Sequence, residues 1–193
     1  MEIWGIILIV IVAIIVIIAV AIIAWVIKTG NWFRQTKVKI DEAKSTIDVS
    51  LTKRFDLLTK SLATVKGYAK HEYETITKTI EMRSGGNKIS DMSMKEKSEL
   101  AQSMTDASKQ INVVLEKYPD LKANEQFNRL QLQIADCEDN LQASRRIFNS
   151  NVSIYNQRIV TFPSSIIANH HGYKKEDFFE AEAAKKEDVK IEF

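Results

Sequence analysis

Three histidines are the side chains of this 193-residue sequence best suited to binding a metal. His71 is followed by Glu72, and His170 is followed by His171. A zinc site on a helix needs ligands three or four residues apart on one face, and no second histidine lies within that reach of His71. The two adjacent imidazoles diverge. The sequence therefore predicts no metal site, unless His71 meets the C-terminal pair in space.

Two aspartates lie beside apolar positions of a predicted helix, where carboxylates could either catalyse or form ion pairs. Asp48 and Asp56 are eight residues apart, which places them on one helix face. Acid–base chemistry also needs a pocket, so we favour a buried pairing with Arg145 or Arg146. Asparagines within a helix seam can specify register and oligomeric state. The residues expected to pair helices or subunits are Asp48, Arg54, Asp56, Arg145, Arg146, Asn149 and Asn156.

The single cysteine, Cys137, lies on the apolar face of a predicted helix. No histidine stands at helical spacing beside it, so a packed and inert thiol is expected. The sequence has no Gly-rich phosphate loop, nucleophile elbow or dinucleotide fingerprint. We therefore expect a protein that is not an enzyme and binds no cofactor.

The segment from Ile3 to Ile27 contains no charged or strongly polar residue. A bilayer-spanning helix needs about 20 apolar residues, so this run is long enough to cross a membrane. Trp4, Trp25 and Lys28 flank it and are expected at the membrane interface. The alternative is a cleaved signal peptide, but no basic region precedes the run and no small-residue cleavage site follows it. We expect a transmembrane anchor.

Basic residues follow the apolar run, whereas only Glu2 and the amino terminus precede it. Lys28, Arg34, Lys37 and Lys39 predict, by the positive-inside bias, that the C-terminal domain lies in the cytoplasm. The whole chain has a formal net charge of +2 and no dense basic cluster interleaved with aromatics. Nucleic acid is therefore not an expected partner, and the lipid bilayer is.

Apolar residues recur at helical spacing through most of the remaining chain. They predict helices from Gln35 to about Arg83, from Met94 to Lys117 and from about Asn124 to Thr161. Gly67 could break the first helix, and the Gly30-Asn31 pair could mark a joint between the anchor and the domain. The stretch 84–93 is predicted to be a loop, and Tyr118-Pro119 ends the second helix. Ser164-Ser165 could cap a short helix after Pro163.

These elements predict an all-α fold: a single N-terminal transmembrane helix followed by an antiparallel bundle of long helices. The expected divisions are an anchor at 1–30, a bundle at 31–173 and a charged, frayed tail at 174–193. The second helix is only about half as long as the first, so part of the first helix's apolar stripe is expected to stay uncovered. Neighbouring subunits would cover it, giving a coiled-coil-like homo-oligomer larger than a dimer.

Five stretches resemble the signatures of the LemA family, in family order and over most of the chain after the apolar run. They are DEAKSTIDVSLTKRFDLL (41–58), VKGYAKHE (65–72), YPDLKANEQFNRLQ (118–131), SRRIFNSNVSIYNQRI (144–159) and FPSSIIANHHGY (162–173). The chain departs from the family at Thr59-Lys60, where a Pro-Asn pair is usual, and at Phe148-Asn149, where Tyr-Asn is common. Neither change affects the expected fold.

The resemblance implies a helical bundle anchored in a bacterial inner membrane, with no agreed enzymatic activity. Some relatives are associated with membrane-organelle formation, and others occur near genes for membrane zinc metalloproteases. Two functions from different classes follow. The first is a non-enzymatic scaffold that self-assembles and organises a membrane or membrane protein complex. The second is a membrane-bound adaptor for a protease or signalling system, with docking surfaces at 118–124 and 162–173.

Overall fold

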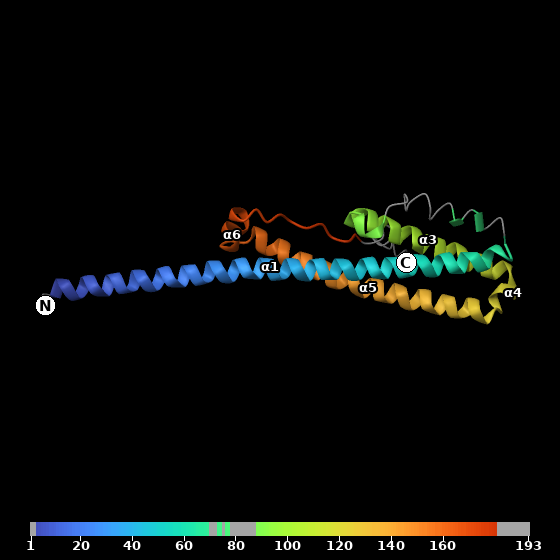
Figure 1. Cartoon of the computed structure of the whole chain (residues 1–193), viewed down its shortest axis with the longest axis horizontal. Helices are drawn as coiled ribbons and strands as arrows, with labels where there is room; N and C mark the ends of the chain where they lie inside the picture. Colours follow the sequence, from blue (N-terminus) through green and yellow to red (C-terminus); the bar gives the residue numbers. More distant parts are fainter. Residues whose placement is uncertain (1–2, 70–72, 75, 78–87, 181–193) are drawn as a thin grey trace, which may run out of the picture. The chain divides into compact units, whose positions relative to one another are not determined.

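The computed structural model describes residues 3–69, 73–74, 76–77 and 88–180, and these residues form helices and connecting segments without a strand (Figure 1). The elements are α1 (Ile3–Lys66), the 3-10 helix η1 (Ile89–Asp91), α3 (Met94–Lys117), α4 (Pro119–Lys122), α5 (Glu125–Val160) and α6 (Ser164–His170). Tyr73, Glu74, Ile76 and Thr77 are also helical. The prediction of an all-α chain is confirmed.

Helix α1 is continuous over 64 residues, so Gly30-Asn31 is not a joint. At 1.5 Å per residue the helix is about 96 Å long. It contains no proline, and its two glycines do not interrupt its hydrogen bonds. It ends at Lys66, where the Gly67 N–H donates to the Thr64 carbonyl in a turn. The break that the sequence allowed at Gly67 is thus found, and the predicted helix end near Arg83 lies outside the described residues.

Helix α3 has the predicted bounds because its ends carry strong local signals. Ser93 accepts a hydrogen bond from the Glu96 N–H, and the Glu96 carboxylate accepts one from the Ser93 N–H, which forms a capping box. At the other end Tyr118 precedes Pro119 and leaves the helical conformation. Both termini follow from local sequence.

Helix α5 ends one residue before the predicted end, and α6 follows after a short turn that contains Pro163. Ser164 does not cap α6 as expected. Its hydroxyl donates to the carbonyls of Arg158 and Thr161, so it satisfies the last turn of α5 instead.

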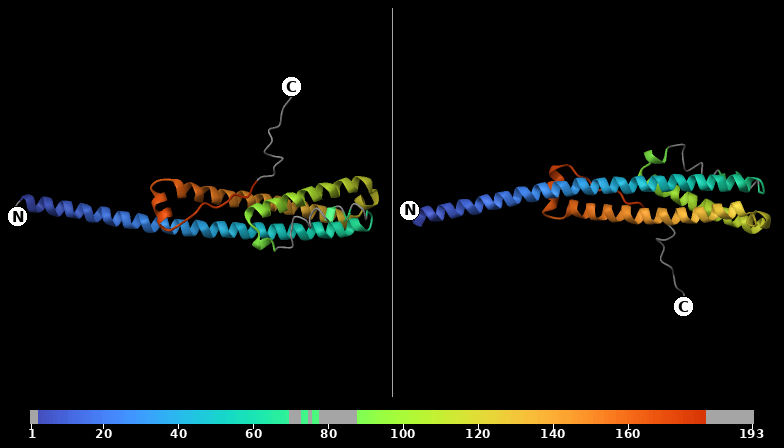
Figure 2. Two further views of the ribbon diagram at one scale, coloured as in Figure 1. Left: turned by 90° about the horizontal axis from the view of Figure 1, so that it is seen from above. Right: turned by 60° about the horizontal axis from the view of Figure 1, so that its bottom comes forward.

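The chain divides into two compact units, each built from segments distant in sequence. Unit 1 consists of residues 1–40 and 151–176, and unit 2 of residues 41–150 and 177–193. In unit 2, parts of α1, α3 and α5 lie side by side (Figure 2). Their shared core is apolar, and its most deeply buried members include Ile47, Leu51, Leu100, Met104, Ile111, Phe127 and Leu141.

The core of unit 1 is aromatic. Phe33 of α1 is fully buried and packs edge-to-face on Tyr155 of α5, with ring centroids 5.8 Å apart. Tyr173, which follows α6, stacks on the same ring at 4.9 Å. One phenylalanine therefore joins three segments of unit 1.

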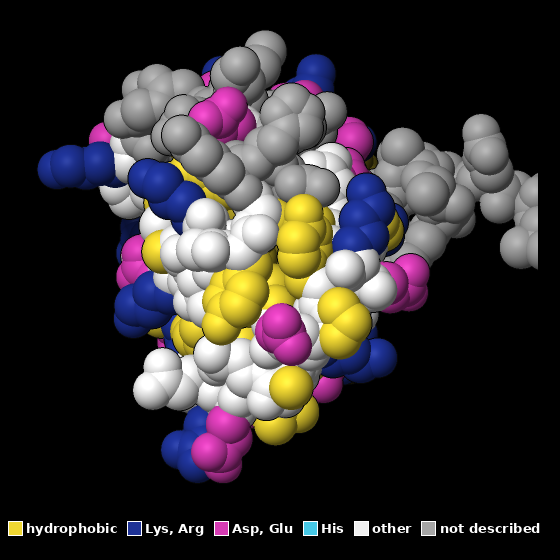
Figure 3. All heavy atoms as spheres, turned by 90° about the vertical axis from the view of Figure 1, so that its right-hand side faces the viewer, with side chains coloured by type: hydrophobic (Ala, Val, Ile, Leu, Met, Phe, Trp, Pro, Cys, Tyr) yellow, Lys and Arg dark blue, Asp and Glu magenta, His cyan; other side chains and the backbone are white. Residues whose placement is uncertain are grey.

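Two expectations about surfaces are wrong. The apolar stripe of α1 is buried within the chain from Phe33 to Val65, so the length of the first helix leaves no long uncovered stripe. The tail is not frayed at its start, because Phe179 is 2 % exposed. Residues 181–193 lie outside the described part. At the end of unit 2 that carries α4, hydrophobic side chains are visible near the centre and at separate places among charged and polar ones (Figure 3).

Candidate functional site

Arg54 is the most deeply buried guanidinium among the described residues, at 2 % exposure. It joins three helices of unit 2. From α1 it donates to the Ala101 carbonyl at 3.2 Å and to the Thr105 hydroxyl at 3.0 Å, both on α3, and it pairs with Glu138 on α5 at 2.6 Å. The low polarity around a buried charge makes such a pair costly to break. Arg54 therefore sets how these three helices pack.

A second buried charge, Lys97 of α3, is fully covered and pairs with Asp48 of α1. The expected pairing of Asp48 or Asp56 with Arg145 or Arg146 is therefore wrong. Asp56 and Arg146 are exposed. The guanidinium of Arg145 lies over the ring of Phe179, 4.4 Å from its centroid. Asp48 and Asp56 lie on roughly the same face of α1, but Asp48 is paired with the buried Lys97 whereas Asp56 is exposed to solvent.

The Cys137 thiol is 1 % exposed and contacts the Ser50 carbonyl at 3.4 Å. Burial raises its pKa, an effect that the nearby Lys53 and Arg54 charges oppose. A raised pKa leaves little nucleophilic thiolate at neutral pH, which agrees with the packed, inert thiol predicted from the sequence.

Asn149 and Asn156, which were expected to pair helices or subunits, each bind one backbone residue of the extended segment 174–180 within the chain. In unit 2 the Asn149 amide donates to the Phe179 carbonyl and accepts from its N–H, both at 2.9 Å. In unit 1 Asn156 does the same with Glu176, at 2.8 and 2.9 Å. A side-chain amide has the same donor and acceptor pair as a peptide group. Each asparagine therefore makes the two hydrogen bonds with the backbone that a neighbouring β-strand would make. We call these two contacts the asparagine clamps.

The histidines do not form a metal site in the described chain. The rings of His170 and His171 are edge-to-face with centroids 5.3 Å apart, and His71 lies outside the described residues. No group of three or more His, Cys, Asp or Glu side chains in the described ranges is placed to hold a metal.

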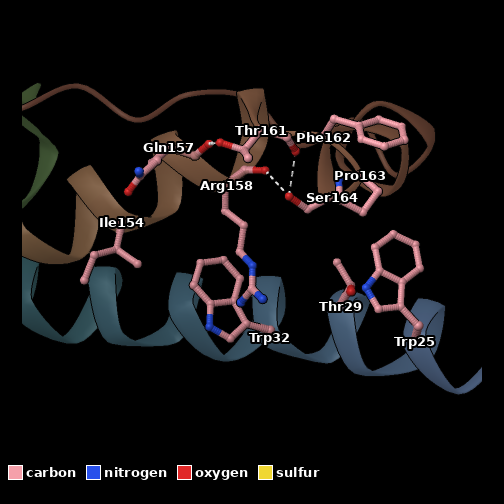
Figure 4. A pocket seen from close by; sticks show the side chains of 10 residues that line it. All are labelled: Trp25, Thr29, Trp32, Ile154, Gln157, Arg158, Thr161, Phe162, Pro163 and Ser164. Carbon is pink, nitrogen blue, oxygen red and sulfur yellow. Dashed lines mark hydrogen bonds between the residues drawn. The ribbon is translucent and has the colours of Figure 1, made fainter.

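Unit 1 has a groove of about 460 Å³ beside the end of the apolar run (Figure 4). One wall comes from α1, through Trp25, Thr29 and Trp32, which recur at helical spacing on one face. The other wall comes from the end of α5 and the turn into α6. Its residues are Ile154, Gln157, Arg158, Thr161, Phe162, Pro163 and Ser164.

Arg158 supplies the charge of this groove. Its guanidinium lies over the Trp32 ring, 4.1 Å from the centroid, which is the geometry of a cation–π contact. Figure 4 shows the arginine side chain extending from α5 toward α1. Stacking leaves the edge of the guanidinium able to donate hydrogen bonds. The sequence reasoning missed Arg158 and Trp32, although the seven-residue spacing of Trp25 and Trp32 was a usable signal.

The predicted interface residues lie on the surface of α1. Trp4 is 78 % exposed, Trp25 is 36 % exposed, and Lys28 is exposed. From Ile3 to Ile27 nearly every side chain is exposed and apolar, and α1 is the one described helix long and apolar enough to cross a membrane. An exposed apolar helix joined to helical units defines a helical, membrane-associated class of protein.

Comparison with known proteins narrows this class to a family. The profile of the LemA family matches residues 43–193, which is more than half of the chain, so the chain belongs to the LemA family. It is 28 % identical to Protein LemA of Metamycoplasma hominis over 153 residues, covering 78 % of this chain and 68 % of that protein. It is also 25 % identical to Magnetosome protein MamQ of Magnetospirillum gryphiswaldense over 71 residues, covering 37 % of this chain and 26 % of that protein.

Proposed function

We propose that this chain is a non-enzymatic, single-pass membrane protein that self-assembles and organises a membrane or a membrane protein complex. Anchoring is supported by α1, whose apolar run from Ile3 to Ile27 has no described partner and would be insoluble in water without lipid. The helical units would then form an antiparallel bundle held at the bilayer surface.

A structural role is supported by how the chain uses its charged groups. Arg54 and Lys97, the buried cations, are both committed to ion pairs between helices. Arg54 and Glu138 do line a pocket of about 340 Å³, but they are paired with each other there, whereas catalysis needs titratable groups directed at a substrate.

One observation carries self-assembly: unit 2 buries charge while it exposes branched aliphatic side chains. Val49 is 66 %, Leu132 is 68 % and Ile147 is 59 % exposed. Copies anchored in one membrane share an orientation and have a raised effective concentration, so weak apolar contacts suffice for assembly. We expect a homo-oligomer larger than a dimer.

Assembly is tested by measuring the mass of the full-length protein in mild detergent, with and without residues 1–30. We expect a large species that Leu132→Lys weakens. Gln133→Lys, an exposed neighbour with the same added charge, should leave it unchanged. Equal small species with and without the anchor would contradict self-assembly. A foreign protein recovered in stoichiometric amount from membranes would favour the adaptor function.

Orientation is part of the same proposal, and the basic residues from Lys28 to Lys39 support a cytoplasmic C-terminal domain. The test is a Ser90→Cys variant in a Cys137→Ser background, labelled in intact cells with a membrane-impermeant thiol reagent. Ser90 is exposed on the protein, so a thiol reagent on the same side of the membrane can reach a cysteine there. We expect labelling only after the membrane is permeabilised, because the proposed orientation places this residue in the cytoplasm. Labelling in intact cells would reverse the orientation.

A further inference from the structure

The groove of unit 1 begins where the apolar run of α1 ends. Its α1 wall starts at Trp25, two residues before the last residue of the run, and continues through Thr29 to Trp32. If α1 spans a bilayer, as proposed above, these residues pass from the edge of the hydrocarbon layer into the headgroup region. The groove therefore opens at the depth of lipid phosphates.

The opposite wall exposes apolar side chains at the same place. Phe162 is 77 % exposed, and Val160 and Ile166, on either side of it in the sequence, are 57 % and 56 % exposed. In Figure 4 the Phe162 ring lies on the Trp25 side of the groove, away from Trp32. Exposed aromatic and aliphatic residues at a helix corner fit insertion among lipid chains better than contact with water.

The groove also carries a cation without a carboxylate partner. Among the described residues Arg158 forms no ion pair, and its contact is the Trp32 ring. A stacked guanidinium presents a planar fork of donors that matches two phosphate oxygens. Stacking orders the side chain before a ligand binds, which lowers the entropic cost of binding.

The net charge of unit 1 also favours binding of an anionic lipid. Unit 1 has seven Lys or Arg residues and two carboxylates in its sequence, whereas unit 2 has twenty and twenty-three. The carboxylate of Glu176 is already paired with Lys37 at 2.5 Å. Basic residues close to a bilayer are attracted to anionic lipids.

We propose that this groove binds the phosphate headgroup of an anionic phospholipid, with Arg158 as the phosphate ligand and the Phe162 corner inserted among the acyl chains. The inference rests on the proposed anchoring of α1. It adds a second membrane contact to unit 1, formed by a part of the chain more than 120 residues after the anchor. Such a contact fixes unit 1 against the bilayer surface and makes its position depend on lipid composition.

Lipid binding is tested by titrating the full-length protein in detergent with phosphatidylglycerol or phosphatidylcholine and counting bound lipid by native mass spectrometry. We expect Arg158→Gln to weaken phosphatidylglycerol binding about tenfold, as loss of a charge-assisted contact to phosphate would. The affinity of Arg158→Lys for phosphatidylglycerol should lie between those of the wild type and Arg158→Gln, because lysine keeps the charge but lacks the planar fork of donors. Arg34→Gln, the same charge change on an exposed residue outside the groove, should have little effect.

Equal weakening by Arg158→Gln and Arg34→Gln would show attraction by general charge and overturn the site. Inorganic phosphate that binds as tightly as the lipid would also overturn it, because the groove would then be a site for the free anion.

Insertion is tested with a fluorophore at Phe162→Cys, in a Cys137→Ser background, and quenchers on the upper acyl chains of vesicle lipids. We expect strong quenching there and weak quenching at Ser153→Cys, nine residues earlier on α5. Flotation with the vesicles separates the two proposals. Wild-type protein that fails to float overturns the anchor, whereas a floating protein with an unquenched Phe162 label overturns only the second contact.

Discussion

Units 1 and 2 share two long helices but place apolar and charged side chains in opposite ways. Unit 2 covers Arg54 and Lys97 almost completely and pairs both between helices. Unit 1 leaves nearly the whole run from Ile3 to Ile27 exposed and carries seven basic residues against two carboxylates. The distribution in unit 2 is that of a domain stabilised from within, in water. The distribution of side chains in unit 1 suits an environment that has an apolar layer and a negatively charged surface.

The comparison also shows one device that both units use. Each has one asparagine clamp that holds an extended backbone residue against α5. Asn149 binds the backbone of Phe179 in unit 2, and Asn156 binds the backbone of Glu176 in unit 1, so each clamp is local to its own unit.

The largest expected effect tests whether the exposed apolar side chains of unit 1 belong in lipid. Ile14→Asp combined with Ile18→Asp places two carboxylates in the middle of the run, at a cost of about 6 kcal/mol for membrane insertion. We expect the variant to lose flotation with membranes while its helical circular dichroism persists. An unchanged membrane fraction would remove the basis of the contrast between the units.

The same chemical change in unit 2 should have the opposite result. Leu141 is fully buried, so Leu141→Asp places an unpaired carboxylate in the core at a cost of about 4 kcal/mol. We expect loss of cooperative thermal unfolding with membrane binding retained. Gln133→Asp, exposed on the same helix, is the control. A Leu141→Asp variant that melts like the parent would show that this face of α5 does not lie in a core.

A smaller effect separates buried from exposed charge within unit 2. Asp48→Asn leaves the fully buried Lys97 without its counter-charge, and we expect a loss of about 2–3 kcal/mol of unfolding free energy. The value lies at the low end for buried pairs because the Asp48 side chain is 21 % exposed. Asp56→Asn should change stability by less than about 0.5 kcal/mol. Denaturant melts of both variants measure the difference, and similar losses would contradict the assignment.

The clamps predict a local effect. Asn149→Asp keeps the acceptor for the Phe179 N–H but loses the donor to its carbonyl, at a cost of about 1–2 kcal/mol. Amide hydrogen exchange should rise in segment 174–180 and stay unchanged in α3. Asn140→Asp, exposed on the same helix, should leave exchange of the segment at the parent level. Faster exchange in that control would show that added charge alone loosens the segment.

The smallest expected effect concerns the cap of α3. Ser93→Ala removes one capping hydrogen bond and should cost about 1 kcal/mol. Hydrogen bonds from the Ser93 backbone and, to a smaller extent, from its side chain lower the pKa of Glu96 from its ordinary value. A lowered folded-state pKa stabilises the fold above the unfolded value, and this contribution disappears as the pH falls through the folded value. The melting temperature of Glu96→Gln should therefore vary less with acid pH than that of the parent. Equal pH dependence would mean that the cap is not ionic.

The sequence by itself determined the helical class, the apolar run and the bounds of α3. These depend on signals within a few residues, such as the capping box at Ser93 and the proline after Tyr118. The periodicity of α5 likewise identified its buried face, from Phe127 through Leu141 to Tyr155. LemA membership followed from short stretches of sequence for the same reason.

Only the tertiary structure decided the partners. Sequence placed Asp48 near a helix seam, but whether it meets Arg145 or Lys97 depends on how three helices rotate about their axes, and a turn of one residue moves a side chain by about 100°. The clamps required knowing that segment 174–180 returns along α5. The groove required that Arg158 reach Trp32 across more than 120 residues of chain. Local patterns specify which face of a helix is apolar, whereas long-range packing selects which polar side chains meet, because their short-range contacts depend on the position of every neighbouring element.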